Sequence, residues 1–297
     1  MKNKMKIYTQ APLPFMGQKR RWSSAFKTAL VSYSDCHTFI DLFGGSGLLS
    51  HFAKVARPDA NVIYNDFDGY THRLAEIPRT NELLGELREL LKNCPDNKRI
   101  EEPYRSRVLQ AVERREREGY VDYVTLSASV LFSGEYVTSF AQLRKETLYN
   151  IVRTSDYCAD GYLDGITVTH EDYRALFDRW KSEDGVCFLI DPPYLSTQAS
   201  TYTGYWRLRD YLDVLRLLHD TNYFYFTSEK SSIIELCEWM GEGHVVGNPF
   251  AGAVKVEQGA RLNHTARYTD IMLHRHKTKG GGQAARSTSI TRRCATS

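Results

Sequence analysis

Residues 188–197, FLIDPPYLST, carry the clearest signature for chemistry: an apolar run ends in Asp191, and Pro192, Pro193 and Tyr194 follow. The carboxylate and the backbone carbonyls accept hydrogen bonds, whereas the prolines have no N–H to donate. This suits a planar amino group, because Asp191 can accept one of its hydrogens, Pro192 the other, and Tyr194 can stack on the attached ring. Accepting both hydrogens would localise the nitrogen lone pair and make the amine a nucleophile. A turn with a purely structural role is the alternative reading.

A second group of residues predicts a nucleoside site. Gly44, Gly45 and Gly47 follow the strand-like FIDLF (39–43) and precede an apolar helix start, where glycines let a ligand approach the backbone closely. Asp66 ends the next strand-like run, 19 residues after Gly47, which is the position of an acid that binds ribose hydroxyls. The same pattern serves NAD, FAD and S-adenosylmethionine. A tight loop for the glycines and a helix N-cap for Asp66 are the structural alternatives.

The elements that must position these residues alternate along the chain. Short apolar, β-branched or aromatic runs predict strands at 38–43, 61–66, 166–170, 186–191, 223–228 and 269–274. Helix-like segments separate most of them, and 210–221 has the spacing of a crossover helix. The expected fold class is therefore α/β, with a doubly wound, mainly parallel Rossmann-like sheet.

The interval between Asp66 and Asp191 is too long for that sheet alone. It spans 125 residues, whereas two βα steps need roughly 50 to 60. We therefore expect a catalytic domain at 1–74 and 163–276, with an inserted, mostly helical, arginine-rich recognition domain at 75–162. Residues 277–297 are basic and read as a disordered tail that either contacts phosphates or is simply solvated.

Composition restricts the protein class. The net charge is +3 and the six cysteines never form C-x-x-C, which argues against a zinc knuckle or a disulfide framework and for a reducing compartment. The N-terminal stretch lacks the apolar core of a signal peptide, and no run approaches the length of a membrane span. We expect a cytoplasmic protein without membrane contact and with no metal in its chemistry.

Taken in order, FIDLFGGSG, YNDFD and DPPY resemble the Dam-like N6-adenine DNA methyltransferases, and FMGQKRRW is similar to the W-A-G-G-K element of that family. The resemblance implies S-adenosylmethionine as methyl donor and Asp191, Pro192, Pro193 and Tyr194 as the catalytic loop. THEDYRALF (169–177) resembles the family element that lines the cofactor adenine pocket. The implied cofactor contacts are Phe15, Gly17, Lys19, Asp41, Phe43, Gly44, Gly45, Gly47, Asp66, Asp172, Tyr173 and Asp191.

The predicted function is methylation of the N6 amino group of an adenine flipped out of DNA, with double-stranded DNA as the expected partner and a monomer assumed. Methylation of N4-cytosine or RNA and an inactive nucleic-acid-binding module are the alternatives. The R-x-N-x-x-G-x-F-N hairpin pattern of Dam enzymes is absent from residues 130–150. The recognition sequence, its degree of specificity and a partner endonuclease, as in restriction-modification systems, thus stay open. Arg144 and Asn150 are candidate DNA contacts, with a solvated face as the alternative.

Overall fold

The structure is a computed structural model that describes residues 6–132, 135–194, 206–244, 247–261 and 267–277. The chain divides into two compact units. One contains Gly69–Asp164 together with the residues up to Arg20, and the other contains Arg21–Asp68 together with the residues from Gly165 onward. The predicted tail, apart from Lys277, lies outside the described residues.

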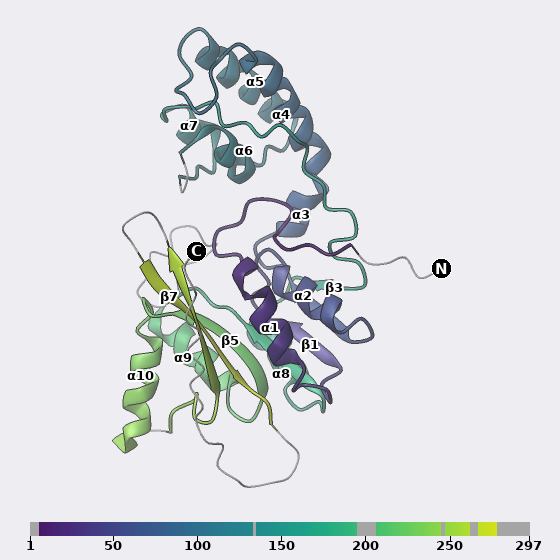
Figure 1. The fold of residues 1–297 in the computed structure, drawn as a ribbon, viewed down its shortest axis with the longest axis vertical. Helices are drawn as coiled ribbons and strands as arrows, with labels where there is room; N and C mark the ends of the chain where they lie inside the picture. Colours follow the sequence, from purple (N-terminus) through teal and green to yellow (C-terminus); the bar gives the residue numbers. More distant parts are fainter. Residues whose placement is uncertain (1–5, 133–134, 195–205, 245–246, 262–266, 278–297) are drawn as a thin grey trace, which may run out of the picture. The chain divides into compact units, whose positions relative to one another are not determined.

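The second unit is built on a seven-stranded sheet in the order β3-β2-β1-β4-β5-β7-β6 (Figure 1). Neighbouring strands from β3 to β5 are parallel, and β7 and β6 are added antiparallel. The predicted α/β class with a mainly parallel sheet is confirmed. The strands are β1 Thr38–Asp41, β2 Asn61–Asn65, β3 Thr167–Thr169, β4 Val186–Ile190, β5 Asn222–Ser228, β6 Val254–Arg261 and β7 Arg267–Arg275.

Sequence patterns predicted six of these strands and missed β6. Its residues VKVEQGAR form the edge of the sheet, so no continuous apolar run marks it. The central strands are the opposite case, because every residue of β1 and β4 is buried. Strands that are covered on both faces read as unbroken apolar runs, and that is why TFID and VCFLI were recognisable.

Helices cover both faces of this sheet, and β5 shows the alternation most clearly. Tyr223 and Tyr225 face a cluster that includes residues of α8, α9 and α10, whereas Phe224 and Phe226 pack against Phe26 of α1. The helices of this unit are α1 Ser23–Leu30, α2 Leu48–Ala56, α8 Tyr173–Trp180, α9 Leu208–Leu217 and α10 Ile233–Trp239, with short turns of helix at Arg20–Trp22 and Met240–His244.

The first unit is helical in its described part. Its helices are α3 Tyr70–Ala75, α4 Ile77–Leu91, α5 Tyr104–Glu118, α6 Tyr123–Val130 and α7 Phe140–Leu143. Leu84, Leu87 and Leu91 of α4 have helical spacing and are buried in this unit's core with Val108 and Val112 of α5. Between α3 and α6, Arg73 Nε donates to Asp122 Oδ2 at 3.0 Å, and both side chains are largely buried.

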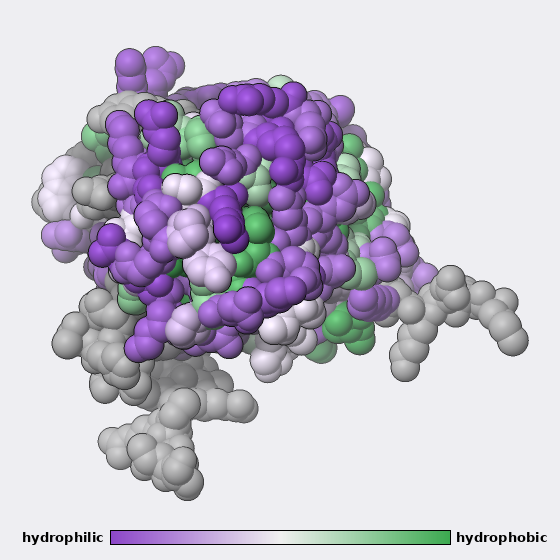
Figure 2. Space-filling model, turned by 90° about the horizontal axis from the view of Figure 1, so that it is seen from above, coloured by the Kyte–Doolittle hydropathy of each residue, from purple (hydrophilic) through white to green (hydrophobic). Residues whose placement is uncertain are grey.

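Figure 2 shows one face on which hydrophilic residues predominate and hydrophobic residues form only small patches. Among the described residues, no helix is long and apolar enough to span a membrane.

Candidate active site

The glycine turn and the DPPY segment emerge side by side because β1 and β4 are adjacent. Asp41 is in register with Leu189, and the backbone N–H of Leu42 donates to the Leu189 carbonyl at 3.1 Å. From β1 the chain continues to β2 and β3 on one side, and β4 leads to β5 on the other. Such a reversal of strand order opens a crevice at the carboxyl ends of the strands, where open α/β sheets bind ligands.

The glycine turn has a specific steric requirement. Gly45 and Gly47 have φ values of 51° and 72°, in a backbone region that residues other than glycine rarely adopt. Gly44 is constrained differently, since a Cβ at this position would lie 2.1 Å from Cε2 of Tyr64 and 2.7 Å from the Asn65 carbonyl. The turn therefore closes tightly onto β2 and leaves its outer face to a ligand.

Two of the predicted acids lie beneath this turn. Asp41 is 1% exposed, and its Oδ2 accepts a hydrogen bond from Ser50 Oγ of α2 at 2.8 Å. Asp66 is also 1% exposed, and its Oδ1 lies 3.0 Å from Tyr64 Oη, which also lies 2.7 Å from the Gly45 carbonyl. Both carboxylates therefore help to hold the turn in place.

Beside the turn lies a cleft of about 240 Å³. It brings together six residues that the sequence had singled out: Phe43, Gly45, Asp172, Tyr173, Asp191 and Pro193. Most of the remaining lining residues fall in segments quoted in the sequence analysis, but they were not named individually as contacts: Leu42, Asn65, Phe67, Asp68, Glu171, Arg174, Trp206 and Asp210. For Phe67, the available signal in the sequence was its position directly after Asp66 at the end of a predicted strand, and the structure leaves its side chain 64% exposed.

Three rings form one wall of the cleft. The ring centroids of Phe43 and Tyr173 are 4.9 Å apart and those of Phe43 and Trp206 5.6 Å apart. Tyr173 and Trp206 are nearly parallel, at 6.0 Å and 17°. Burial raises the pKa of Tyr173 to about 12, and its Oη has no hydrogen-bond partner among the described residues. The wall is thus aromatic, with Phe43 tilted against two nearly parallel rings and with one buried hydroxyl whose partner could be a ligand.

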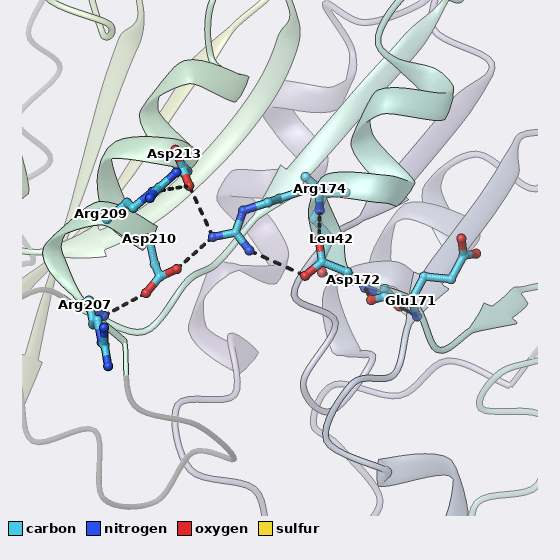
Figure 3. A network of polar contacts seen from close by, with 9 residues as sticks. Leu42, Glu171, Asp172, Arg174, Arg207, Arg209, Asp210 and Asp213 are labelled. Atoms are coloured by element: carbon cyan, nitrogen blue, oxygen red, sulfur yellow. Dashed lines mark hydrogen bonds and ion pairs between the residues drawn. The ribbon is translucent and has the colours of Figure 1, made fainter.

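A charged network forms the rim of the cleft and joins α8 to α9 (Figure 3). Arg174 Nη2 lies 2.7 Å from Asp210 Oδ1 and 3.3 Å from Asp213 Oδ2. Asp210 also accepts the backbone N–H of Arg207, and this bond is the main reason that its pKa is lowered, with Arg174 contributing. The predicted cofactor residue Asp172 caps α8 by accepting the backbone N–H of Arg174 at 2.8 Å.

One buried amide ties together the ends of the strands below the cleft. Asn65 Nδ2 donates to the carbonyls of Leu42 and Glu171, at 3.1 and 2.9 Å, and Asn65 Oδ1 accepts the Glu171 N–H at 2.9 Å. Both amide hydrogens and the amide oxygen of Asn65 are therefore used, and they link β1, β2 and the segment after β3. The cleft floor is therefore cross-linked before any ligand binds.

The DPPY segment, which the sequence predicts to be the catalytic loop, follows the central strand β4. Asp191 and Pro193 line the cleft, Pro192 is buried and Tyr194 is partly buried. Tyr225 on β5 is in register with Ile190, and its pKa is raised well above its usual value by burial, with the charge of Asp191 contributing. The segment that follows, 195–205, is outside the described residues.

Three buried hydroxyl groups at the end of the neighbouring strand β5 were not named as site residues from the sequence. Thr227, Ser228 and Ser231, at the carboxyl end of β5, are no more than 5% exposed. Their oxygens have no hydrogen-bond partner within the part of the chain that the structure describes. Buried polar groups normally find partners, so these hydroxyls are available to a polar ligand at the end of the sheet.

The remaining predicted cofactor residues belong to the other unit. Phe15 packs edge-on against Tyr70 at 5.6 Å. Gly17 has a φ of 79°, and its carbonyl accepts a hydrogen bond from Lys19 Nζ at 2.9 Å. These contacts shape the N-terminal segment locally, and the cofactor role of Phe15, Gly17 and Lys19 stays a prediction.

The helical unit corrects one candidate DNA contact. Asn150 is 7% exposed, and its Nδ2 donates to the Cys94 carbonyl at 3.0 Å. It is therefore a structural residue, since its amide is used inside the unit. Arg144 is exposed and keeps its predicted role as a candidate.

The arginines of α5 are largely paired with acids. Arg115 lies 3.0 Å from Glu82, Arg117 lies 3.1 Å from Glu113, and Arg114 contacts Glu86. The arginine cluster of the sequence therefore does not give α5 a surface of unpaired positive charge at these three positions.

Comparison with known proteins agrees with this geometry. The family model of the D12 class N6 adenine-specific DNA methyltransferases matches residues 15–221. A protein of Haemophilus influenzae named "Putative methyltransferase" is 38% identical over 288 residues, covering 93% of this chain and 95% of the relative. The family match spans all the residues that line the cleft, from Leu42 to Asp210.

Proposed function

Because the chain belongs to the D12 class N6 adenine-specific DNA methyltransferases, we propose that it methylates the N6 amino group of an adenine in DNA with S-adenosylmethionine as donor. The observation that carries this proposal is the meeting of Asp191 and Pro193 with Phe43, Gly45 and Tyr173 in one cleft. An acceptor-rich loop and an aromatic wall at the switch point of the sheet are what an amino-group methyltransferase needs.

The cleft residues fit the donor. When bound, S-adenosylmethionine supplies an electrophilic methyl group. Phe43, Tyr173 and Trp206 would hold its adenine ring, and the buried Tyr173 hydroxyl offers it a hydrogen bond. The Gly45 turn would accommodate its methionine part, and Asp66, anchored by Tyr64, would accept its ribose hydroxyls. Phe15, Gly17 and Lys19 complete the proposed set.

The chain's own contribution to chemistry is orientation and charge. Asp191 accepts one hydrogen of the adenine amino group, the carbonyl of Pro192 accepts the other, and Tyr194 stacks on the base. The base leaves the duplex at a cost of a few kcal/mol. The amino nitrogen would gain positive charge as its bond to the methyl carbon forms and the carbon–sulfur bond of the donor breaks. The Asp191 carboxylate would stabilise that charge until the extra proton of the nitrogen passes to solvent. Acceptors fixed before the reaction account for most of the expected rate enhancement.

We further propose that the helical unit contacts DNA. Arg144 is exposed, as is Lys145 next to it on the segment after α7. Among the described residues, neither side chain takes part in a hydrogen bond or ion pair with an acid that would neutralise it. Phosphate contacts from such residues would position the duplex without reading its sequence.

The proposal is tested by incubating the purified protein with duplex DNA and methyl-labelled S-adenosylmethionine and identifying the methylated nucleoside. We expect N6-methyladenine. Asp191→Ala should lower turnover by at least about a hundredfold while DNA and cofactor binding persist, because the lost contact matters mainly in the transition state.

Other products would redirect the assignment. N4-methylcytosine, or methylation of RNA alone, would replace the substrate and keep the chemistry. Cofactor binding without any transfer would identify a binding module. Near-normal turnover of Asp191→Ala would mean that DPPY is only a turn.

A further inference from the structure

At the end of the strands opposite the cleft, three residues with different side-chain chemistry come together. Asp35 and Cys36 precede β1, and His276 follows β7. One carboxylate oxygen, the thiol sulfur and one imidazole nitrogen all lie within 4.8 Å of one another. β7 runs antiparallel to β5 and Arg275 is in register with Tyr223, so the end of β7 lies where the parallel strands begin. The group therefore lies at the opposite end of the strands from Asp191.

The loop that carries Asp35 and Cys36 is held in shape independently of these side chains. Arg57 donates to three of its carbonyls, those of Tyr33, Ser34 and Cys36, at 2.7, 3.1 and 2.8 Å. The His276 ring packs against the Tyr33 ring with centroids 4.8 Å apart. The loop with Asp35 and Cys36 and the ring of His276 are thus held in position before any ligand binds, as a metal site requires.

The three donors match the preferences of one ion. Thiolate, imidazole and carboxylate together are ligands of Zn²⁺, which takes four donors in a tetrahedron. Cys36 is fully buried, and its sulfur lies within 4.8 Å of both the Asp35 carboxylate oxygen and the His276 ring nitrogen.

We propose that Asp35, Cys36 and His276 form a zinc site that joins the loop before β1 to the end of β7, with water as the fourth ligand. Binding forms bonds from zinc to oxygen, sulfur and nitrogen and releases the Cys36 thiol proton to solvent. The site lies at the end of the strands away from the cleft, so zinc bound there would link two segments of the sheet and take no part in the chemistry of the cleft. It does not depend on the proposed methyl transfer.

An ordinary ion pair is the competing explanation. His276 Nε2 lies 2.6 Å from Asp35 Oδ1, which a salt bridge alone accounts for. The chain offers a matched control for that reading: His219 Nδ1 lies 3.1 Å from Asp220 Oδ2, and this exposed pair forms part of no metal-ligand group among the described residues. A salt bridge predicts that both pairs behave alike toward metal, whereas a zinc site predicts that only one binds it.

The test uses the full-length protein, stripped with a chelator and titrated with Co²⁺ as a spectroscopic probe and then with Zn²⁺ against a colorimetric competitor. We expect one equivalent of Co²⁺, a thiolate-to-cobalt charge-transfer band, and displacement by Zn²⁺. Cys36→Ser should abolish the band, and His276→Gln should weaken zinc binding by at least about tenfold. His219→Gln and Cys158→Ser should leave both unchanged.

A folding control keeps the outcome interpretable. Zn²⁺ should raise the melting temperature of the wild type, since it binds only the folded state, and should not raise that of Cys36→Ser. Circular dichroism and cofactor binding check that the variants are folded, and Asp35→Asn provides a milder change if Cys36→Ser is not. Absence of the charge-transfer band in the wild type, or its persistence in Cys36→Ser or in a folded Asp35→Asn with unchanged zinc affinity, would overturn the proposal.

Discussion

Arg174 Nη2 on α8 lies 2.7 Å from Asp210 Oδ1 on α9, so an ion pair joins the two helices. Near the start of these helices, the rings of Tyr173 and Trp206 lie nearly parallel. Tyr173 directly precedes Arg174, and Trp206 lies shortly before Asp210. The pair therefore acts on the cleft through the two rings, as a positioning contact.

Replacing Arg174 with alanine should loosen Trp206 from Tyr173 and weaken S-adenosylmethionine binding by a few-fold, because partly exposed ion pairs are worth about 0.5–1 kcal/mol. Calorimetric titration measures the affinity, and kinetics should show KM rising more than kcat falls. Arg209→Ala is the control, since Arg209 is 89% exposed and reaches Asp213 only at 4.0 Å. Equal losses in both variants would contradict a positioning role for Arg174.

Asp210 gives this network a pH dependence. Its pKa is lowered mainly by the backbone N–H of Arg207 and further by Arg174. A carboxylate with a lowered pKa stabilises the fold above its unfolded value of about 3.9, and that contribution is lost as pH falls through the folded value, because the unfolded chain takes up the proton first. The melting temperatures of the wild type and Asp210→Asn should therefore differ above this range and converge below it. A constant difference would exclude the carboxylate charge as the cause.

Gly44→Ala should damage the glycine turn, the proposed binding site of the cofactor, directly. Its Cβ would lie 2.1 Å from the Tyr64 ring, and overpacking of this kind costs about 1–3 kcal/mol or more. We expect a melting temperature lower by several degrees and loss of cofactor binding. Gly259→Ala on β6 is the matched control, since nothing lies within 4 Å of its added Cβ. Normal affinity in folded Gly44→Ala would show that the turn tolerates displacement.

Asp66→Asn should weaken S-adenosylmethionine binding by about tenfold or more, since a hydrogen bond to a charged group is worth about 1.5–3 kcal/mol. The amide can still accept from Tyr64 and keeps the packing. Asp68, which lines the cleft, provides the comparison, and Asp68→Asn should change affinity less. The reverse order of the two affinities would move the ribose contact from Asp66 to Asp68.

The pairing of the α5 arginines predicts a selective effect on DNA binding. Arg117→Gln removes a cation already 3.1 Å from Glu113, so DNA affinity and its salt dependence should hardly change. Lys145→Gln should lower the slope of log affinity against log salt by close to one if it contacts a phosphate. Fluorescence anisotropy at several salt concentrations measures both slopes. A larger change for Arg117 would place the DNA on the α5 face.

Local sequence patterns were sufficient for the elements and for part of the site. The unbroken apolar runs of β1 and β4 predicted buried parallel strands, and this burial is observed. The strand ends also marked the cleft, because the pairing of β1 with β4 brings the Phe43–Gly45 turn and Asp191 to one edge. β6 escaped prediction because an edge strand needs no apolar run.

The sequence by itself therefore determined the sheet, the glycine turn and the DPPY loop, because periodicity, glycine and proline act within a few residues of themselves. Tertiary structure alone decided which distant side chains meet. Asn65 links Leu42 with Glu171, Arg174 reaches Asp210, and Cys36 meets His276 across the sheet. These contacts depend on strand register and helix packing, which are set by the sum of many burial interactions along the chain and leave no short pattern in the residues that they bring together.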